Sequence, residues 1–212
     1  TGIGMFPDVG GSWFLPRCPG EIGMFLGLVG KGLKAADCLH AGIAEANVPM
    51  ARHEDLIAAL ASGQTPDAAL ASLHTDPGPA PIAEHRAVID RCFGVGSVAE
   101  ILAALDDEEN GWAQAIRDEL LRKSPFALEV AYRQLRRGRD LDFEDCLVME
   151  YRISQRIVHS HDFREGVRAV IIDKDQAPRW DPPSLAEVDD TRIEACFAPL
   201  HDGDLTFGGE RN

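Results

Sequence analysis

The stretch TGIGMFPDVGG at residues 1–11 holds one carboxylate, Asp8, between a proline and a double glycine. Proline fixes φ on one side of the acid, and the glycines let backbone or a ligand approach closely on the other side. The apolar residues at 13–15 predict a helix that enters the core. Asp8 is therefore expected on a rigid turn at a helix N-terminus, where exposed N–H groups favour negative charge.

An aspartate at this place has two interpretations. Asp at the start of a helix commonly serves as the N-cap, whose carboxylate accepts a hydrogen bond from a backbone N–H group. In the other interpretation, the fixed turn presents the acid to a ligand. Physical chemistry alone favours the N-cap.

Separated motifs along the chain favour the functional interpretation. They stand at residues 1–17, 28–37, 41–44, 123–125, 149–155, 161–163 and 173–176. In this order they resemble the crotonase (enoyl-CoA hydratase/isomerase) superfamily, and the wording FPDVGG at 6–11 resembles its 3-hydroxyisobutyryl-CoA hydrolases most closely. The resemblance extends to about Phe207.

The resemblance implies an α/β crotonase-like fold, which has a spiral β-sheet core with helices. This chain would be its mostly α C-terminal part, with little strand. Residues 1–50 would be the end of the crotonase core with the active-site turn, and residues 51–212 the C-terminal helical region of the same domain. The family segment before Thr1 would supply most of the sheet, the two N–H donors for the thioester oxygen, and a glutamate. The chain is therefore expected to be a fragment, inactive alone.

The activity implied by the resemblance is that of an acyl-CoA thioester hydrolase, specifically a 3-hydroxyisobutyryl-CoA hydrolase of valine catabolism. It would use paired carboxylates and an oxyanion hole supplied by the N-terminal part. Asp8 would be catalytic, because the turn acid of these hydrolases faces the acyl end of the substrate beside that glutamate. Hydratases of the superfamily commonly carry a small residue at this turn, so an acid here favours hydrolysis over hydration. An enoyl-CoA hydratase or isomerase, and a noncatalytic piece that docks on a partner, stay open as alternatives.

The resemblance also implies which residues bind the substrate. Phe6, Asp8 and Gly10 would face the acyl end, and Lys174 would reach the coenzyme A phosphates or adenine. The spacing from Glu165 to Lys174 is one residue longer than in typical hydratases, so a solvated surface lysine is an equal alternative. Acyl-coenzyme A enters as substrate, with no further cofactor, and a homo-oligomer stays open. The expected location is the cytoplasm, or the mitochondrial matrix in a eukaryote.

A net charge of −14 excludes the basic footprint of a nucleic-acid-binding protein and does not suit docking on anionic lipid. Since coenzyme A is polyanionic, a local basic patch is required. The arginines at 133, 136, 137 and 139 are interpreted as a solvated helix end. Five scattered cysteines without metal spacing predict reduced thiols. His161 and Asp162 are assigned to a helix cap rather than to a metal.

Local signals predict a largely helical chain. The run Asp162 to Glu165 has capping-box spacing. Residues 43–48 are the best candidate for a strand, 76–81 form a loop, and the residues after 175 form a tail that wraps rather than packs. Helices are expected at residues 20–29, 34–40, 53–60, 66–73, 82–92, 98–105, 111–122, 125–137 and 142–158.

Overall fold

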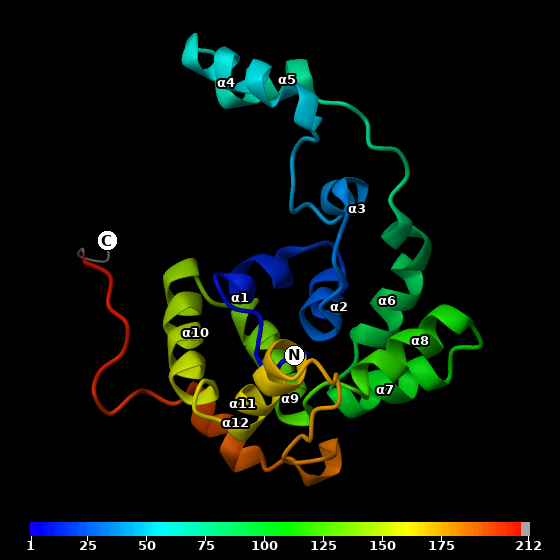
Figure 1. The fold of residues 1–212 in the computed structure, drawn as a ribbon, viewed down its shortest axis with the longest axis vertical. Helices are drawn as coiled ribbons and strands as arrows, with labels where there is room; N and C mark the ends of the chain where they lie inside the picture. The colour runs from blue at the N-terminus through cyan, green and yellow to red at the C-terminus, as the bar shows by residue number, and fades with distance from the viewer. Residues whose placement is uncertain (209–212) are drawn as a thin grey trace. The chain divides into compact units, whose positions relative to one another are not determined.

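Every regular element among the described residues, 1–208, is a helix in this computed structural model (Figure 1). The α-helices are α1 (Gly11–Phe14), α2 (Ile22–Val29), α3 (Ala35–His40), α4 (His53–Ala61), α5 (Pro66–Leu73), α6 (Arg86–Phe93), α7 (Val98–Asp106), α8 (Gly111–Leu120), α9 (Pro125–Gly138), α10 (Phe143–Ile157), α11 (His161–Val167) and α12 (Asp190–Phe197). Short 3₁₀ turns are η1 (Leu15–Arg17), η2 (Met50–Arg52), η3 (Pro81–His85) and η5 (Leu185–Glu187), and η4 (Arg168–Ile172) is a π-helix. The structure of these residues confirms the prediction of a mostly α chain.

The strand predicted at residues 43–48 is wrong. Ile43 N and Ala44 N both donate to Cys38 O, at 3.0 and 3.2 Å, and so close the C-terminal end of α3. Gly42 makes this reversal with a φ of 69°, the left-handed conformation that glycine adopts without steric cost. The alternating residues at 43–48 therefore form the C-terminal cap of α3 and an extended loop, and no strand.

The chain divides into two compact units, one formed by Thr1–Lys31 and Val88–Asn212, the other by Gly32–Ala87. In the smaller unit α4 packs against α5, and both helices lie where the sequence predicts them. Its loop at 76–80 links α5 to η3. The expected division at residue 50 stays a prediction, and residues 209–212 of its second part lie outside the described residues.

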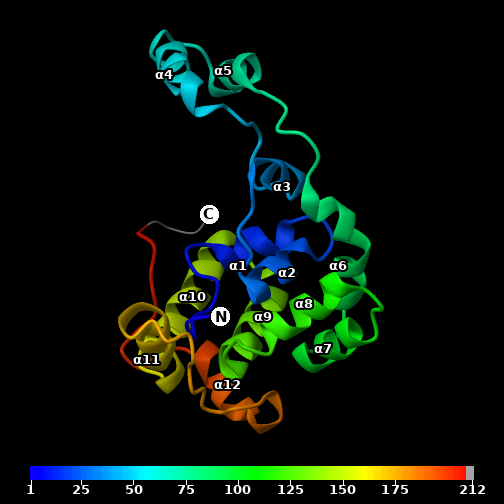
Figure 2. The same cartoon turned by 45° about the vertical axis from the view of Figure 1, so that its right-hand side comes forward.

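The core of the larger unit lies around α9, α10 and α12, and α12 packs against both α9 and α10 (Figure 1, Figure 2). Helix α9 begins as its sequence predicts: the Ser124 hydroxyl accepts a hydrogen bond from Ala127 N at 3.0 Å, and Pro125 takes the first helical position. The buried side chains of this cluster are Phe6, Phe126, Val130, Met149, Ile153, Ile157, Ile193, Cys196 and Phe197.

The predicted tail after residue 175 is wrong in one part, because α12 packs into this core. Ile193, Cys196 and Phe197 are buried there. Their spacing of three and four residues is a helical signal that would have located α12 in the sequence.

Close backbone packing fixes α2 in the same unit. A Cβ atom at Gly23 would lie 1.7 Å from Leu15 O, so only glycine fits this crossing. Gly23 therefore lets the backbone of α2 lie directly against that of η1. Each helix in residues 1–208 is too short or too polar to span a lipid bilayer.

Candidate active site

The turn that carries Asp8 has an unusual backbone. Val9 and Gly10 have φ angles of 56° and 88°, and Gly11 N donates to Asp8 O at 3.0 Å. A β-branched residue at positive φ is a genuine outlier, which persists only where the surroundings hold it. The Val9 side chain is 85% exposed and the Asp8 side chain is exposed beside it. The turn therefore projects both side chains into solvent.

Glu150 of α10 holds this turn in place. Its two carboxylate oxygens accept hydrogen bonds from Gly10 N at 2.9 Å and from Ser12 N at 2.8 Å. Gly10 is the N-cap of α1 and has no side chain to satisfy these donors. Glu150 is only 5% exposed. It thus performs the capping role that the first interpretation assigned to Asp8, whose carboxylate accepts no hydrogen bond from the described residues.

Gln134 of α9 holds the other side of the turn. Its buried side-chain amide donates to Pro7 O and, at 2.7 Å, to Ser12 Oγ. A Cβ atom at Gly138 would lie 2.0 Å from Ser12 O, which shows how closely α1 lies on α9. Two helices that are distant in sequence therefore fix the Asp8 turn.

Helix α1 does not enter the core, contrary to the sequence prediction. Only Ser12 is buried among its four residues, and Phe14 is 55% exposed. Trp13 and Phe14 make edge contacts with Phe143 of α10, with ring centroids 5.8 and 6.0 Å away. Four residues are too few for a helix to bury a face, so the aromatic side chains form a surface cluster beside the turn.

The four predicted substrate residues lie in different environments. Phe6 is buried in the core cluster, and the Gly10 N–H group is occupied by Glu150. Asp8 and Lys174 have exposed side chains. Phe6 and Gly10 therefore support the turn, and the contacts of all four with substrate stay predictions.

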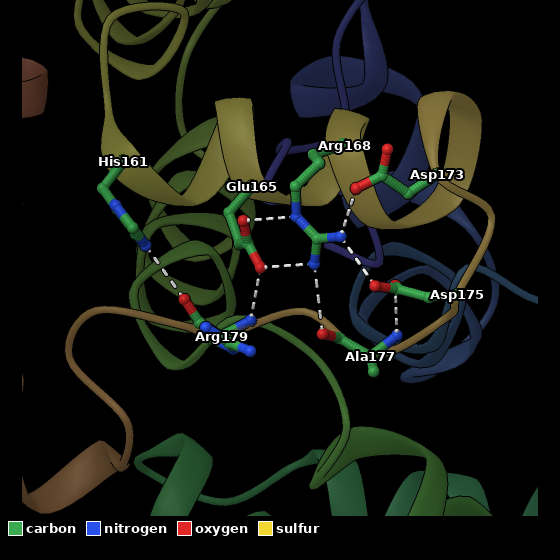
Figure 3. A network of polar contacts seen from close by, with 7 residues as sticks. All are labelled: His161, Glu165, Arg168, Asp173, Asp175, Ala177 and Arg179. Atoms are coloured by element: carbon green, nitrogen blue, oxygen red, sulfur yellow. Dashed lines mark hydrogen bonds and ion pairs between the residues drawn. The ribbon is translucent and has the colours of Figure 1, made fainter.

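Lys174 follows a polar network centred on Arg168 (Figure 3). The guanidinium donates from Nε and Nη2 to the two oxygens of Glu165, at 2.9 and 2.8 Å. From Nη1 it donates to Asp173 Oδ2 at 2.8 Å and to Asp175 Oδ2 at 2.6 Å. Such a fork-to-carboxylate pairing is strong and directional. The i, i+3 spacing of Arg168 from Glu165 is the only feature of the sequence that indicates this network.

The network shifts the pKa values of its acids. Hydrogen bonds from Arg168 and from Arg179 N lower the pKa of Glu165 to about 2. The Ala177 N–H group and then Arg168 lower the pKa of Asp175. Both acids therefore stay ionised well below neutral pH.

The capping box predicted from Asp162 to Glu165 is wrong. Ser160 caps α11, since its Oγ accepts a hydrogen bond from Phe163 N at 3.1 Å. Asp162 is buried and accepts hydrogen bonds from Ser124 Oγ and, at 2.7 Å, from Asp181 N. His161 Nε2 lies 2.9 Å from Arg179 O, again outside a cap. Ser160 stands only two residues before Asp162, so the local sequence offers both as caps. The contacts of Asp162 with Ser124 and Asp181 decided that Ser160 caps α11.

The arginines expected at a solvated helix end are paired with acids of other elements. Arg137 pairs with Glu194 at 2.7 Å, and Arg136 pairs with Glu21 at 3.0 Å. Within residues 1–208, no group of three or more His, Cys, Asp or Glu side chains is placed to hold a metal ion. The five cysteines are free thiols, and all but Cys38 are buried.

The model of the family described as Enoyl-CoA hydratase/isomerase matches residues 1–197. The chain belongs to this family. Two solved structures share the crotonase-type fold of the enoyl-CoA hydratase/isomerase family. They are a carnitinyl-CoA dehydratase from Mycobacterium thermoresistibile, with TM-score 0.90 and 39% identity over 99% of this chain and 60% of that one, and an enoyl-CoA hydratase from Rhodobacter sphaeroides 2.4.1, with TM-score 0.87 and 38% identity over 97% and 60%.

Curated members of the enoyl-CoA hydratase/isomerase family give a second comparison. The chain is 39% identical to the mitochondrial 3-hydroxyisobutyryl-CoA hydrolases of Danio rerio and Homo sapiens, over 97% and 98% of its length. It covers 56% of each relative, so it spans about half the length of these proteins.

Proposed function

We propose that the complete protein containing this chain is an acyl-CoA thioester hydrolase, and that its substrate is the 3-hydroxyisobutyryl-CoA of valine catabolism. The observation that carries the proposal is the exposed Asp8 on a turn held by Glu150 and Gln134. Because Glu150 caps α1, the Asp8 carboxylate is available for chemistry. Identity of 39% to proteins named 3-hydroxyisobutyryl-CoA hydrolase supports this choice of substrate.

In the proposed mechanism, Asp8 acts with a second carboxylate, the glutamate expected from the N-terminal part of the fold. One carboxylate attacks the thioester or activates a water molecule, and the other holds the substrate's 3-hydroxyl group or delivers a proton. Two backbone N–H donors from the N-terminal part would stabilise the thioester oxyanion, a role worth roughly 3–4 kcal/mol. No metal or other cofactor takes part in this mechanism.

Lys174 is proposed to meet the coenzyme A phosphates. This chain has a net charge of −14 and repels the polyanion overall, so binding needs a local cation in the right place. Lys174 is exposed and stands beside the ordered Arg168 network. The proposed location is the cytoplasm, or the mitochondrial matrix if the source is a eukaryote, as the names of the curated relatives suggest.

The test is free thiol release by the complete protein supplied with 3-hydroxyisobutyryl-CoA. Hydrolysis frees one coenzyme A thiol for each thioester cleaved. A hydratase is the second candidate, because the solved structures are named dehydratase and hydratase at similar identity. That activity would consume an enoyl-CoA without releasing thiol, and this result would overturn the hydrolase proposal.

A further inference from the structure

We propose that Arg168 is a positioning residue that fixes the segment after α11 so that Lys174 meets the phosphates of acyl-CoA. The inference rests on the proposed function, which supplies coenzyme A as the ligand. Arg168 acts through Lys174 and does not itself touch the substrate.

The first observation is the π-helix η4 (Arg168–Ile172), which directly precedes Asp173 and Lys174. Asp173 N donates to Arg168 O at 2.8 Å, a hydrogen bond across five residues instead of the four of an α-helix. Such a turn takes up one extra residue. The π-turn therefore sets the point at which Asp173 and Lys174 leave the helix.

The second observation is the backbone around Lys174. Lys174 and Gln176 have φ angles of 58° and 55°, a left-handed conformation that is unfavourable for side chains of this kind. Arg168 binds Asp173 and Asp175, the residues on either side of Lys174. The strained conformation is therefore held at both neighbours by a single guanidinium group.

The third observation is how the segment returns toward α11. Glu165 Oε1 accepts a hydrogen bond from Arg179 N at 2.8 Å, and Arg168 Nη2 donates to Ala177 O at 3.3 Å (Figure 3). Gln176 N donates to Ala169 O at 3.1 Å. The residues on both sides of Lys174 are thus fastened to the helix that precedes it.

Charge gives Arg168 a second effect on the same lysine. Without the guanidinium, the carboxylates of Asp173 and Asp175 would be free to pair with the Lys174 ammonium group and to repel phosphate. With it, both acids are engaged, and Lys174 remains available to an anionic ligand.

The experiment compares Arg168→Met, Lys174→Met and the double variant in the complete protein. Steady-state kinetics are measured with the acyl-CoA and with the matching acyl-pantetheine, which lacks the nucleotide and its phosphates. We expect each single variant to raise KM for the acyl-CoA about tenfold, the loss of one good charge contact, with kcat little changed. KM for acyl-pantetheine should not change, and the double variant should be no worse than Lys174→Met alone.

Arg133→Met is the matched control, because Arg133 of α9 also pairs with three carboxylates, those of Glu129, Asp190 and Glu194. It should lower Tm and leave the ratio of the two KM values unchanged. Arg168→Lys serves as the second variant if Arg168→Met does not fold. Lysine keeps the charge but cannot bridge three acids, so KM for the acyl-CoA should still rise.

Two results would overturn the positioning role. One is a folded Arg168→Met or Arg168→Lys protein with the KM ratio of the unmodified enzyme. The other is additive effects of Arg168→Met and Lys174→Met in the double variant. If unmodified protein releases no thiol, binding of coenzyme A and of pantetheine by calorimetry gives the same comparison. The proposed hydrolase function would then fail while the positioning role stands or falls separately.

Discussion

Glu150 in α10 and Gly10 at the start of α1 lie 140 residues apart in sequence and are joined by a hydrogen bond of 2.9 Å. The second carboxylate oxygen of Glu150 accepts the N–H group of Ser12 two residues further on. A buried acid from elsewhere in the fold thus satisfies the N-terminus of α1. This relationship leaves Asp8 exposed on a turn whose backbone is held in place.

Asp8→Asn in the complete protein tests the catalytic role of Asp8. Asparagine preserves the shape of the side chain and removes its charge, so kcat/KM should fall by a factor on the order of 10² or more. Stability should change by about 0.5 kcal/mol or less, because Glu150 and not Asp8 supplies the cap of α1. Unchanged kinetics together with a lowered Tm would return Asp8 to a purely structural role.

Glu150→Gln should destabilise the fold and reduce activity together. Glutamine offers one acceptor for two backbone N–H groups and turns an NH₂ group toward the other, at a cost of about 1–3 kcal/mol. Chemical denaturation measures the stability, and kcat/KM reports the displaced turn. Glu144→Gln on the same helix is the control, since Glu144 is exposed and should be neutral. Equal stabilities for the two variants would contradict the capping role of Glu150.

Val9→Asn should raise the free energy of unfolding by about 1 kcal/mol, because asparagine tolerates the left-handed conformation that strains valine. The side chain of Val9 is 85% exposed, so little packing is lost. Val158→Asn is the control, since Val158 has a φ of −61° and has no such strain to relieve. Thermal melts of both variants measure the change in stability. A Tm of Val9→Asn below that of the unmodified protein would disprove the strain at Val9.

Glu165 should stabilise the fold above about pH 4.5 and lose this effect as the pH falls. Its pKa in the folded protein is about 2, below the ordinary value of 4.5, so the folded state favours the ionised form. The Tm difference between unmodified protein and Glu165→Gln should therefore narrow from pH 4.5 toward pH 2. A Tm difference that does not change with pH would exclude a stabilising role for the charge of Glu165.

Cys38 should be the only cysteine that reacts readily with a thiol reagent in the native protein. Burial is the main cause that raises the pKa of Cys92 to about 11, and burial also raises the pKa of Cys18, Cys146 and Cys196. Because the thiolate is the reactive form, these four should be labelled only after unfolding. Mass spectrometry of the labelled peptides would show which cysteines react. Labelling of Cys92 in the native protein at neutral pH would contradict the burial of its side chain.

Local signals in the sequence predicted most helices, and they failed where distant contacts mattered. Ser124 and Pro125 start α9 as predicted, because a cap involves only the next three residues. The strand at 43–48 failed because Ile43 and Ala44 bond back to α3 and meet no neighbouring strand among the described residues. The capping box at Asp162 failed because its carboxylate is drawn to Ser124, 38 residues away.

The sequence by itself determined the family, the helical character of the chain and the placement of Asp8 on a rigid turn, since each depends on motifs or on residues close in the chain. Only the tertiary structure decided that Glu150 caps α1 and that Asp8 is exposed. It also decided that Arg168 gathers the acids on both sides of Lys174. The physical reason is that a carboxylate or guanidinium bonds to whichever groups packing brings within about 3 Å, and in the case of Glu150 packing joins residues that the sequence places far apart.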